Sequence, residues 1–177
     1  MKKIILLVSF LLTLQLASQE KLGRPFFTGS SSLTFAINEN YTITPDDGEP
    51  FIIPTAIFFR LGFGYEIQRR VAISFNVGYD YHWNYAISAF PTYGSLRFNI
   101  TEDEDDTFFT EISYGKMWRP SNKYPDGNYY GFGLGTQIAG ENRWNTIVRL
   151  EFHRKGLIGF ENNRLDSVSL GIGFTFF

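Results

Sequence analysis

The side chains in this chain that could take part in catalysis are two histidines, His82 and His153, and two serines that follow His153 in the sequence. His153 follows Glu151 by two positions, and Ser167 and Ser169 lie in the next alternating segment. An imidazole can accept a serine's proton and so activate its hydroxyl as a nucleophile. Nothing in the sequence directs either serine toward His153, and His82 lies among aromatic residues, where we expect it to form hydrogen bonds. We therefore expect no catalytic centre.

Charged residues recur with a period of two, which places residues of one phase on the same face of an extended strand. If that face encloses an interior, its charges must be paired. We expect Arg60, Arg97 and Arg149 to face Glu66, Glu111 and Glu151. The predicted interior network contains Arg60, Glu66, Arg97, Glu111, Arg149, Glu151 and His153, and the same phase includes Asn76, Asp80, His82, Asn99 and Gln137.

Metal and cofactor sites have little support in the sequence. The run 102–106 places five carboxylates in one turn, which could attract a divalent cation through oxygen ligands. The run lacks the glycine and the spacing of the known calcium loop. We expect a solvated turn here, with no metal site and no cofactor.

The strands that would position these side chains are marked by strict alternation. Residues 71–83 alternate large apolar side chains with small or polar ones, as a half-buried strand does. Taken alone, this pattern fits a soluble sandwich as well as a membrane barrel. The design recurs, however, at 57–67, 93–100, 108–115, 130–138 and 144–153, with a first strand around 33–37 and a last around 168–176. About eight strands result, which is the smallest common size of single-chain bacterial membrane barrels.

Short and long connections alternate between these strands. The short ones are 68–70, 101–106 and 139–142, and the long ones are 38–51, 84–90, 119–128 and roughly 154–164. Membrane barrels of bacteria have short periplasmic turns and longer external loops. The pattern predicts that both chain ends are periplasmic and that the long loops are external.

Aromatic residues gather near the predicted strand ends. Tyrosine and tryptophan side chains favour the two interfaces between membrane and water. The outer girdle is expected at Tyr79, Tyr81, Trp83, Trp118, Tyr129 and Tyr130, and the inner girdle at Trp144, Phe174 and Phe176.

The chain begins with the features of an exported protein. Lys2 and Lys3 precede an apolar run from Ile4 to Leu16, and small residues follow, as in a secretory signal peptide. We predict a signal peptide at 1–18 and one barrel domain at 19–177. Without cysteine, the mature chain is expected to be neither lipid-anchored through an N-terminal cysteine nor disulfide-bonded.

Composition narrows the partners further. Cleavage removes two of the 16 basic residues and leaves 18 acidic ones, so the mature charge is 14 − 18 = −4. A chain of this charge is poorly suited to bind nucleic acid. After the signal, no stretch of around 20 apolar residues remains, so insertion in a membrane must use strands.

The end of the sequence carries the most specific motif. This motif is residues 170–177, Leu-Gly-Ile-Gly-Phe-Thr-Phe-Phe. Together with the signal peptide, the alternating strands and the alternating connections, it resembles the small, eight-stranded outer-membrane β-barrel family of Gram-negative-type bacteria. The resemblance covers nearly all of the mature chain. It implies contact with outer-membrane lipids and recognition of the last strand by the barrel assembly machinery. In the usual pattern the last aromatic is in phase with the outward residues, whereas here Phe176 is in phase and Phe177 is one beyond.

The predicted fold is therefore all-β: a closed antiparallel transmembrane β-barrel of about eight up-and-down strands. The interior of such a barrel is just wide enough for side chains to fill it. We expect a structural or surface-interaction role with a plugged lumen and an unidentified external partner. A narrow pore is the alternative, because Gly131, Gly133, Gly135, Ser169, Gly171 and Gly173 offer little filling. Close strand approach is the competing interpretation of these small residues.

An enzyme that modifies lipid A is the third interpretation. Residues 149–156 loosely resemble the histidine-containing strand of the lipid A 3-O-deacylase family, whose motif has a nucleophilic serine two residues after the histidine. Lys155 occupies that position here. The resemblance therefore does not supply a nucleophile, and we expect no enzymatic activity.

Overall fold

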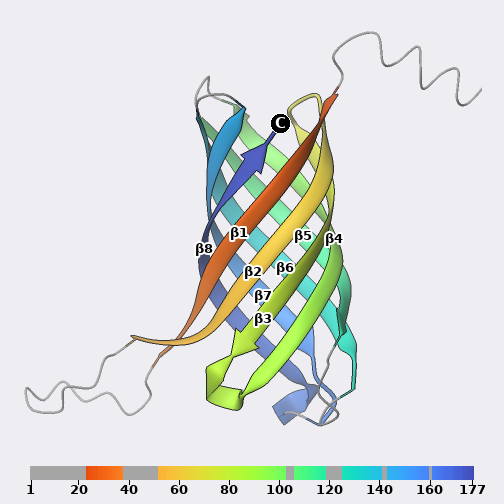
Figure 1. The fold of residues 1–177 in the computed structure, drawn as a ribbon, viewed down its shortest axis with the longest axis vertical. Coiled ribbons are helices and arrows are strands. Elements are labelled where there is room, and N and C mark those ends of the chain that lie inside the picture. Colours follow the sequence, from red (N-terminus) through yellow and green to blue (C-terminus); the bar gives the residue numbers. More distant parts are fainter. Residues whose placement is uncertain (1–22, 38–51, 103–105, 119–124, 141–142, 160) are drawn as a thin grey trace, which may run out of the picture.

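The structure, a computed structural model, describes residues 23–37, 52–102, 106–118, 125–140, 143–159 and 161–177. In these residues eight antiparallel strands close into a barrel, with β1 paired to β8 (Figure 1). The strands are β1 Gly23–Ile37, β2 Ile52–Ile67, β3 Val71–His82, β4 Ile87–Glu102, β5 Asp106–Trp118, β6 Gly127–Ala139, β7 Trp144–Gly156 and β8 Arg164–Phe176. The predicted up-and-down barrel is confirmed. The predicted signal peptide at 1–18 lies outside the described residues.

Alternation of side chains gives the barrel an inside-out distribution of polarity. In β2, Leu61 is 63% exposed on the outer face, whereas its neighbour Arg60 is 5% exposed. The other strands repeat this arrangement, with large apolar side chains outward and charged ones inward. Soluble proteins almost never bury charged residues unless these are paired, and they rarely expose large contiguous apolar surfaces. The distribution is that of a transmembrane barrel, whose outer face meets lipid.

Closure of the barrel depends on the pairing of its first and last strands. The β1–β8 register runs from Phe27 opposite Phe176 to Thr34 opposite Ser169. Register shifts between Thr34 and Phe35 and between Asn99 and Thr101 add local irregularities. Such irregularities bend a strand and increase its twist. The strands cross the barrel obliquely in Figure 1, as closure of a sheet requires.

The connections alternate between the two ends of the barrel. The start of β1, the end of β8 and the connection 68–70 lie at one end, which we call the short-turn end (Figure 1). The opposite end, here the long-connection end, carries the end of β1, η1 and the end of β7 (Figure 1). In the 68–70 turn, Gln68 and Arg69 adopt positive φ values of 49° and 56°.

The predicted long loop at 84–90 is wrong. The 3₁₀ helix η1 (Trp83–Tyr85) is followed by Ala86 in the left-handed region, and β4 begins at Ile87. Pro91 lies within β4, where pairing with β3 is interrupted between Val77–Thr92 and Asp80–Ala89 without a change of register. A proline has no N–H to donate to a strand ladder. Because Pro91 directly follows residues 84–90, this part of the sequence resembled a loop. A second 3₁₀ segment, η2 (Glu161–Asn163), precedes β8.

Within the described residues, no helix is long and apolar enough to cross a membrane.

Candidate functional site in the barrel interior

The interior contains two groups of charged and polar side chains, which we call the glutamate cluster and the histidine cluster. The glutamate cluster consists of Arg97, Glu111, Gln137, Arg149 and Glu151. The histidine cluster consists of Arg60, Asp80, His82, Tyr129, His153, Lys155 and Ser169. All of these side chains are buried, and Glu151 Oε2 approaches His153 Nε2 to 3.9 Å, which brings the two clusters into contact.

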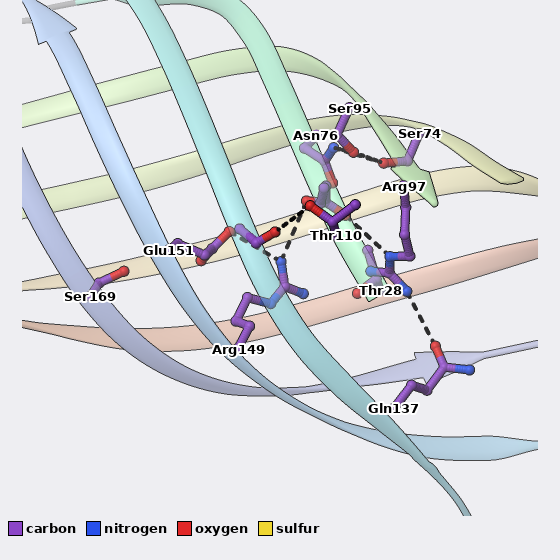
Figure 2. A network of polar contacts seen from close by, with 12 residues as sticks. Thr28, Ser74, Asn76, Ser95, Arg97, Thr110, Gln137, Arg149, Glu151 and Ser169 are labelled. Carbon is purple, nitrogen blue, oxygen red and sulfur yellow. Dashed lines mark hydrogen bonds and ion pairs between the residues drawn. The ribbon is translucent and has the colours of Figure 1, made fainter. Parts of the chain in front are cut away.

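The glutamate cluster joins four neighbouring strands. Arg97 donates from Nε to Glu111 Oε2 and from Nη1 to Gln137 Oε1, both at 3.2 Å. Arg149 Nη1 lies 3.8 Å from Glu111 Oε1 and 3.5 Å from Glu151 Oε1. Figure 2 shows Arg97, Arg149 and Glu151 reaching toward a common centre inside the barrel. Glu111 therefore lies between two arginines from opposite sides, and the sequence predicted that these residues would lie together.

A group of hydroxyl and amide side chains on β3 and β4 lies beside this cluster (Figure 2). The Ser74 and Ser95 hydroxyls are 2.6 Å apart, and Asn76 Nδ2 donates to Ser74 Oγ at 2.9 Å. Buried polar groups are costly unless hydrogen-bonded. These contacts satisfy the inward polar side chains of Ser74, Asn76 and Ser95.

Asp80 is the centre of the histidine cluster. Its carboxylate forms an ion pair with Arg60 Nη1 and a second with Lys155 Nζ, the latter at 2.5 Å. Lys155 Nζ also lies 2.8 Å from His82 Nε2. The aromatic ring of Phe58 lies close by, with its centroid 3.8 Å from Lys155 Nζ. One carboxylate thus serves two buried cations, and the histidine and aromatic groups complete their surroundings.

His153 has partners on both ring nitrogens. Its Nδ1 lies 2.7 Å from the Tyr129 hydroxyl and its Nε2 lies 2.8 Å from Ser169 Oγ. The contact with Ser169 could not be predicted from the sequence, because His153 pairs with Ser167 across the β7–β8 ladder and Ser169 pairs with Glu151. A ring can reach the diagonal neighbour two positions along the partner strand.

The serine–histidine contact is enclosed. Ser169 and His153 are 0% and 1% exposed, and the Phe58 ring meets the His153 ring edge-on at 5.2 Å between centroids. An imidazole next to a hydroxyl has the elements of a nucleophile and its base. Here both groups lie among side chains inside the barrel, on the face opposite to lipid.

Two residues of the predicted network, Arg60 and Glu66, have other partners than expected. Arg60 contacts Asp80 and not Glu66, while Glu66 Oε2 accepts a 2.7 Å bond from Arg24 Nε. The reason is distance along the strand: six residues separate Arg60 from Glu66, or about 20 Å at 3.3 Å per residue. Arg60 pairs with Gly78, so its side chain lies over that glycine and reaches Asp80 two positions further.

Lys155 and Arg24 belong to the interior contacts but were not predicted there. Lys155 continues the inward phase of Glu151 and His153, a signal that was hidden because a loop was expected from residue 154. The strand β7 in fact extends to Gly156. Arg24 precedes the first alternation that the sequence made clear, since β1 begins ten residues before Leu33.

The predicted aromatic girdle is wrong at one position. Tyr129 is 1% exposed and points into the barrel, whereas Tyr130 is 45% exposed. The phase of Gly131 and Gly133, which also face inward, marks Tyr129 as an interior residue. Tyr79, Tyr81, Trp118, Tyr130, Trp144, Phe174 and Phe176 belong to the outward phase of their strands, and Trp83 in η1 is exposed as well. Their position at a membrane interface stays a prediction.

The inward glycines make room for large neighbours. A Cβ atom on Gly135 would lie 2.6 Å from Phe109 Cζ, and one on Gly78 would lie 2.7 Å from Arg60 Cδ. On Gly171 it would lie 3.0 Å from Ser32 Cβ, and on Gly133 3.3 Å from Glu151 Cγ. The small residues that could have lined a pore are therefore covered by side chains from adjacent strands. This favours the interpretation in which glycine permits close packing.

Apolar side chains fill the interior at the long-connection end. This apolar cluster consists of Ala89, Tyr93, Met117, Tyr129, Leu157 and Leu165, all buried. The Tyr93 and Tyr129 rings are 4.7 Å apart, and Leu157 is fixed by a backbone bond from its N–H to Asn163 O at 2.9 Å. The charged clusters are therefore covered by packed apolar groups on this side.

No candidate metal centre accompanies these clusters: among the described residues, no group of three or more His, Cys, Asp or Glu side chains is placed to hold an ion. Residues 103–105 of the acidic run lie outside the part of the chain that the structure describes.

The fold and its filled interior define a closed, eight-stranded transmembrane β-barrel. Solved structures of outer-membrane barrels share this fold. Neisserial surface protein A matches with a TM-score of 0.63 at 8% identity, over 87% of this chain and 97% of its own. The N-terminal β-barrel domain of Pseudomonas aeruginosa OprF matches with a TM-score of 0.52 at 11% identity, over 85% and 97%. The outer membrane enzyme PagL matches with a TM-score of 0.52 at 13% identity, over 83% and 97%.

At these identities the similarity concerns the fold alone. No protein-family model matches the chain, and no curated protein sequence matches it.

Proposed function

We propose that this protein is an integral outer-membrane barrel with a structural or surface-interaction role and a lumen closed to solutes. The observation that carries the proposal is the filled interior, in which the glutamate and histidine clusters lie in contact beneath the apolar cluster. Ion pairs that link opposite walls resist passage, because a solute must break buried contacts to enter. The same contacts stabilise the barrel.

The proposed location rests on the outward apolar belt. With that belt in the membrane, outer-membrane lipids are its partners, and the barrel assembly machinery would recognise β8. By the length of its connections, the short-turn end faces the periplasm and the long-connection end faces outward. Protease treatment of intact cells should cleave within 38–51 and leave the 68–70 turn intact. Cleavage at 68–70 alone would reverse the orientation.

We further propose that the barrel is not an enzyme. PagL is an outer membrane enzyme of the same fold, yet here Lys155 occupies the position of the deacylase-motif serine and is bound to Asp80. Ser169 and His153 are enclosed in the interior. Mass spectra of lipid A from cells with and without the protein should be identical. A missing acyl chain only in cells that produce the protein would contradict this.

Conductance measurements test the closed lumen directly. Refolded protein in a planar lipid bilayer should give no discrete current steps, while a porin added to the same bilayer as a control gives steps. Reproducible small steps from the purified barrel would instead support the narrow-pore alternative. In that case, a surface-interaction role would have to be supported by binding of a partner to the external loops.

A further inference from the structure

The two last residues of the printed sequence point to opposite faces of the barrel wall. Phe176 packs outward against Trp144, with ring centroids 4.8 Å apart. Phe177 instead turns toward Phe26, a buried inward residue, at 5.8 Å between centroids. The N–H of Phe177 donates to Arg143 O at 3.1 Å, which fixes the residue to the β6–β7 connection.

Arg24 holds the Phe177 ring from the other side. Its guanidinium carbon lies 3.4 Å from the centre of the ring, a cation–π contact. Arg24 is oriented by its bond to Glu66, and Asn99 Nδ2 donates to the other oxygen of Glu66 at 3.4 Å. The ring is thus held in a frame built from β1, β2, β4 and β8.

The solvent exposure of the side chains around the Phe177 ring falls from Arg24 toward the interior. The side chain of Arg24 is 44% exposed and that of Glu66 is 7% exposed, while Phe26 behind them is buried. A hollow of about 300 Å³ at the same mouth is lined by Gly23, Arg24, Glu66, Gln68 and Arg69. Water therefore reaches the outer side of the Arg24–Phe177 contact and meets buried groups beyond it.

We propose that Phe177, held by Arg24, is a stopper that closes the short-turn end of the lumen. The apolar cluster closes the long-connection end, so the charged interior lies between two seals of different construction. The inference rests on the proposed closed lumen and adds the residue that controls access to it from one side. It also explains why Phe177 is out of phase with the outward residues, since Phe176 already occupies the outward position.

Cysteine accessibility tests this proposal, because the chain has no cysteine of its own. Ile147 is buried on the inward face of β7, and Ile147→Cys therefore gives a single interior thiol. The rate of its alkylation by a charged, water-soluble maleimide is measured on refolded protein in micelles. Phe177→Ala should raise this rate about tenfold, as expected when a stabilising contact of local structure is lost. Phe176→Ala is the matched control and should leave the rate unchanged.

A second variant, Arg24→Gln, weakens the stopper while the phenyl ring remains, and it should raise the rate by a smaller factor. Heat modifiability on gels verifies that each variant is folded, and Arg24→Gln decides the matter if Phe177→Ala does not refold. Slow alkylation in the parent with equal rates in all variants would overturn the stopper and leave the closed lumen intact. Fast alkylation in the parent itself would overturn the closed lumen and the stopper together.

Discussion

The two charged clusters of the interior are built with different charge balance. The glutamate cluster sets Arg97 and Arg149 against Glu111 and Glu151, two cations for two carboxylates. The histidine cluster sets two cations, Arg60 and Lys155, against the single carboxylate of Asp80. The side chains of both clusters are buried.

This difference in charge balance implies that the two clusters differ in how well they tolerate the loss of a carboxylate. In the glutamate cluster each arginine has an alternative acceptor, because Arg97 also bonds Gln137 and Arg149 also bonds Glu151. In the histidine cluster, the charge of both cations is neutralised by Asp80, and the neighbouring His82 is a much weaker partner. Charges buried without a partner are far more costly than paired ones. Asp80 should therefore be the least replaceable residue of the interior.

Replacing Asp80 by asparagine should have the largest effect on stability. The variant leaves Arg60 and Lys155 buried near each other without a negative charge, at a cost of about 3–5 kcal/mol. Urea unfolding of the refolded barrel in lipid vesicles measures the change. Asp166→Asn is the matched control, because Asp166 on β8 pairs with Arg154 on the outer side of β7, where both side chains are partly exposed. Exposed ion pairs contribute little, so a similar loss in both variants would contradict the central role of Asp80.

Replacing Glu111 by alanine should have a smaller but clear effect. Arg97 and Arg149 lose a shared acceptor and keep Gln137 and Glu151, so we expect a loss of about 1–3 kcal/mol. The folded-to-unfolded transition on heating in detergent micelles should shift to lower temperature. An unchanged transition would mean that Glu111 contributes nothing to the network, and a loss greater than that of Asp80→Asn would reverse the ranking of the clusters.

Replacing Lys155 by methionine tests whether the stability of the histidine cluster depends on its charge balance or on the individual contacts of Lys155. The variant removes one of two cations and leaves the Arg60–Asp80 pair balanced, while the methionine keeps apolar contact with Phe58. The loss should be no more than about 1 kcal/mol, the typical value of one hydrogen bond. The measurement is the same urea titration as for Asp80→Asn. Equal losses in the two variants would show that the cluster depends on each contact and not on its charge balance.

The sequence predicted the glutamate cluster better than the histidine cluster, and the reason is physical. Period two assigns a residue to a face, so the inward positions of Arg60, Arg97 and Glu111 followed from alternation alone. The partner of each residue depends on register, which is set by pairing across strands. Arg97 lies directly opposite Glu111, so proximity and complementary charge agree. Arg60 lies opposite a glycine and reaches past it to Asp80, which alternation cannot indicate.

Element boundaries explain the remaining errors. Lys155 and Tyr129 lie at strand ends near the long-connection end, where Asn, Gly and charged residues imitate loop composition. The structure extends β6 and β7 through these positions, because the inward phase continues there with side chains that can be buried in the network and in the apolar cluster. The role of Phe177 was marked in the sequence only as a break in phase. Its contact with Arg24 joins the start of β1 to the residue that follows β8, and a contact between such distant parts of the sequence could not be inferred from local pattern.

Replacing Ser169 by alanine should have the smallest effect on stability. It tests the region where the histidine cluster meets the glutamate cluster. Ser169 donates or accepts one neutral hydrogen bond with His153 Nε2, and His153 keeps Tyr129 as its other partner. The loss should be about 1 kcal/mol or less in the urea titration, because no charge is left without a partner. Ser167→Ala is the matched control, since its buried hydroxyl has no hydrogen-bond partner among the described residues. A loss for Ser169→Ala that equals that of Asp80→Asn would mean that the histidine, and not the carboxylate, organises this half of the interior.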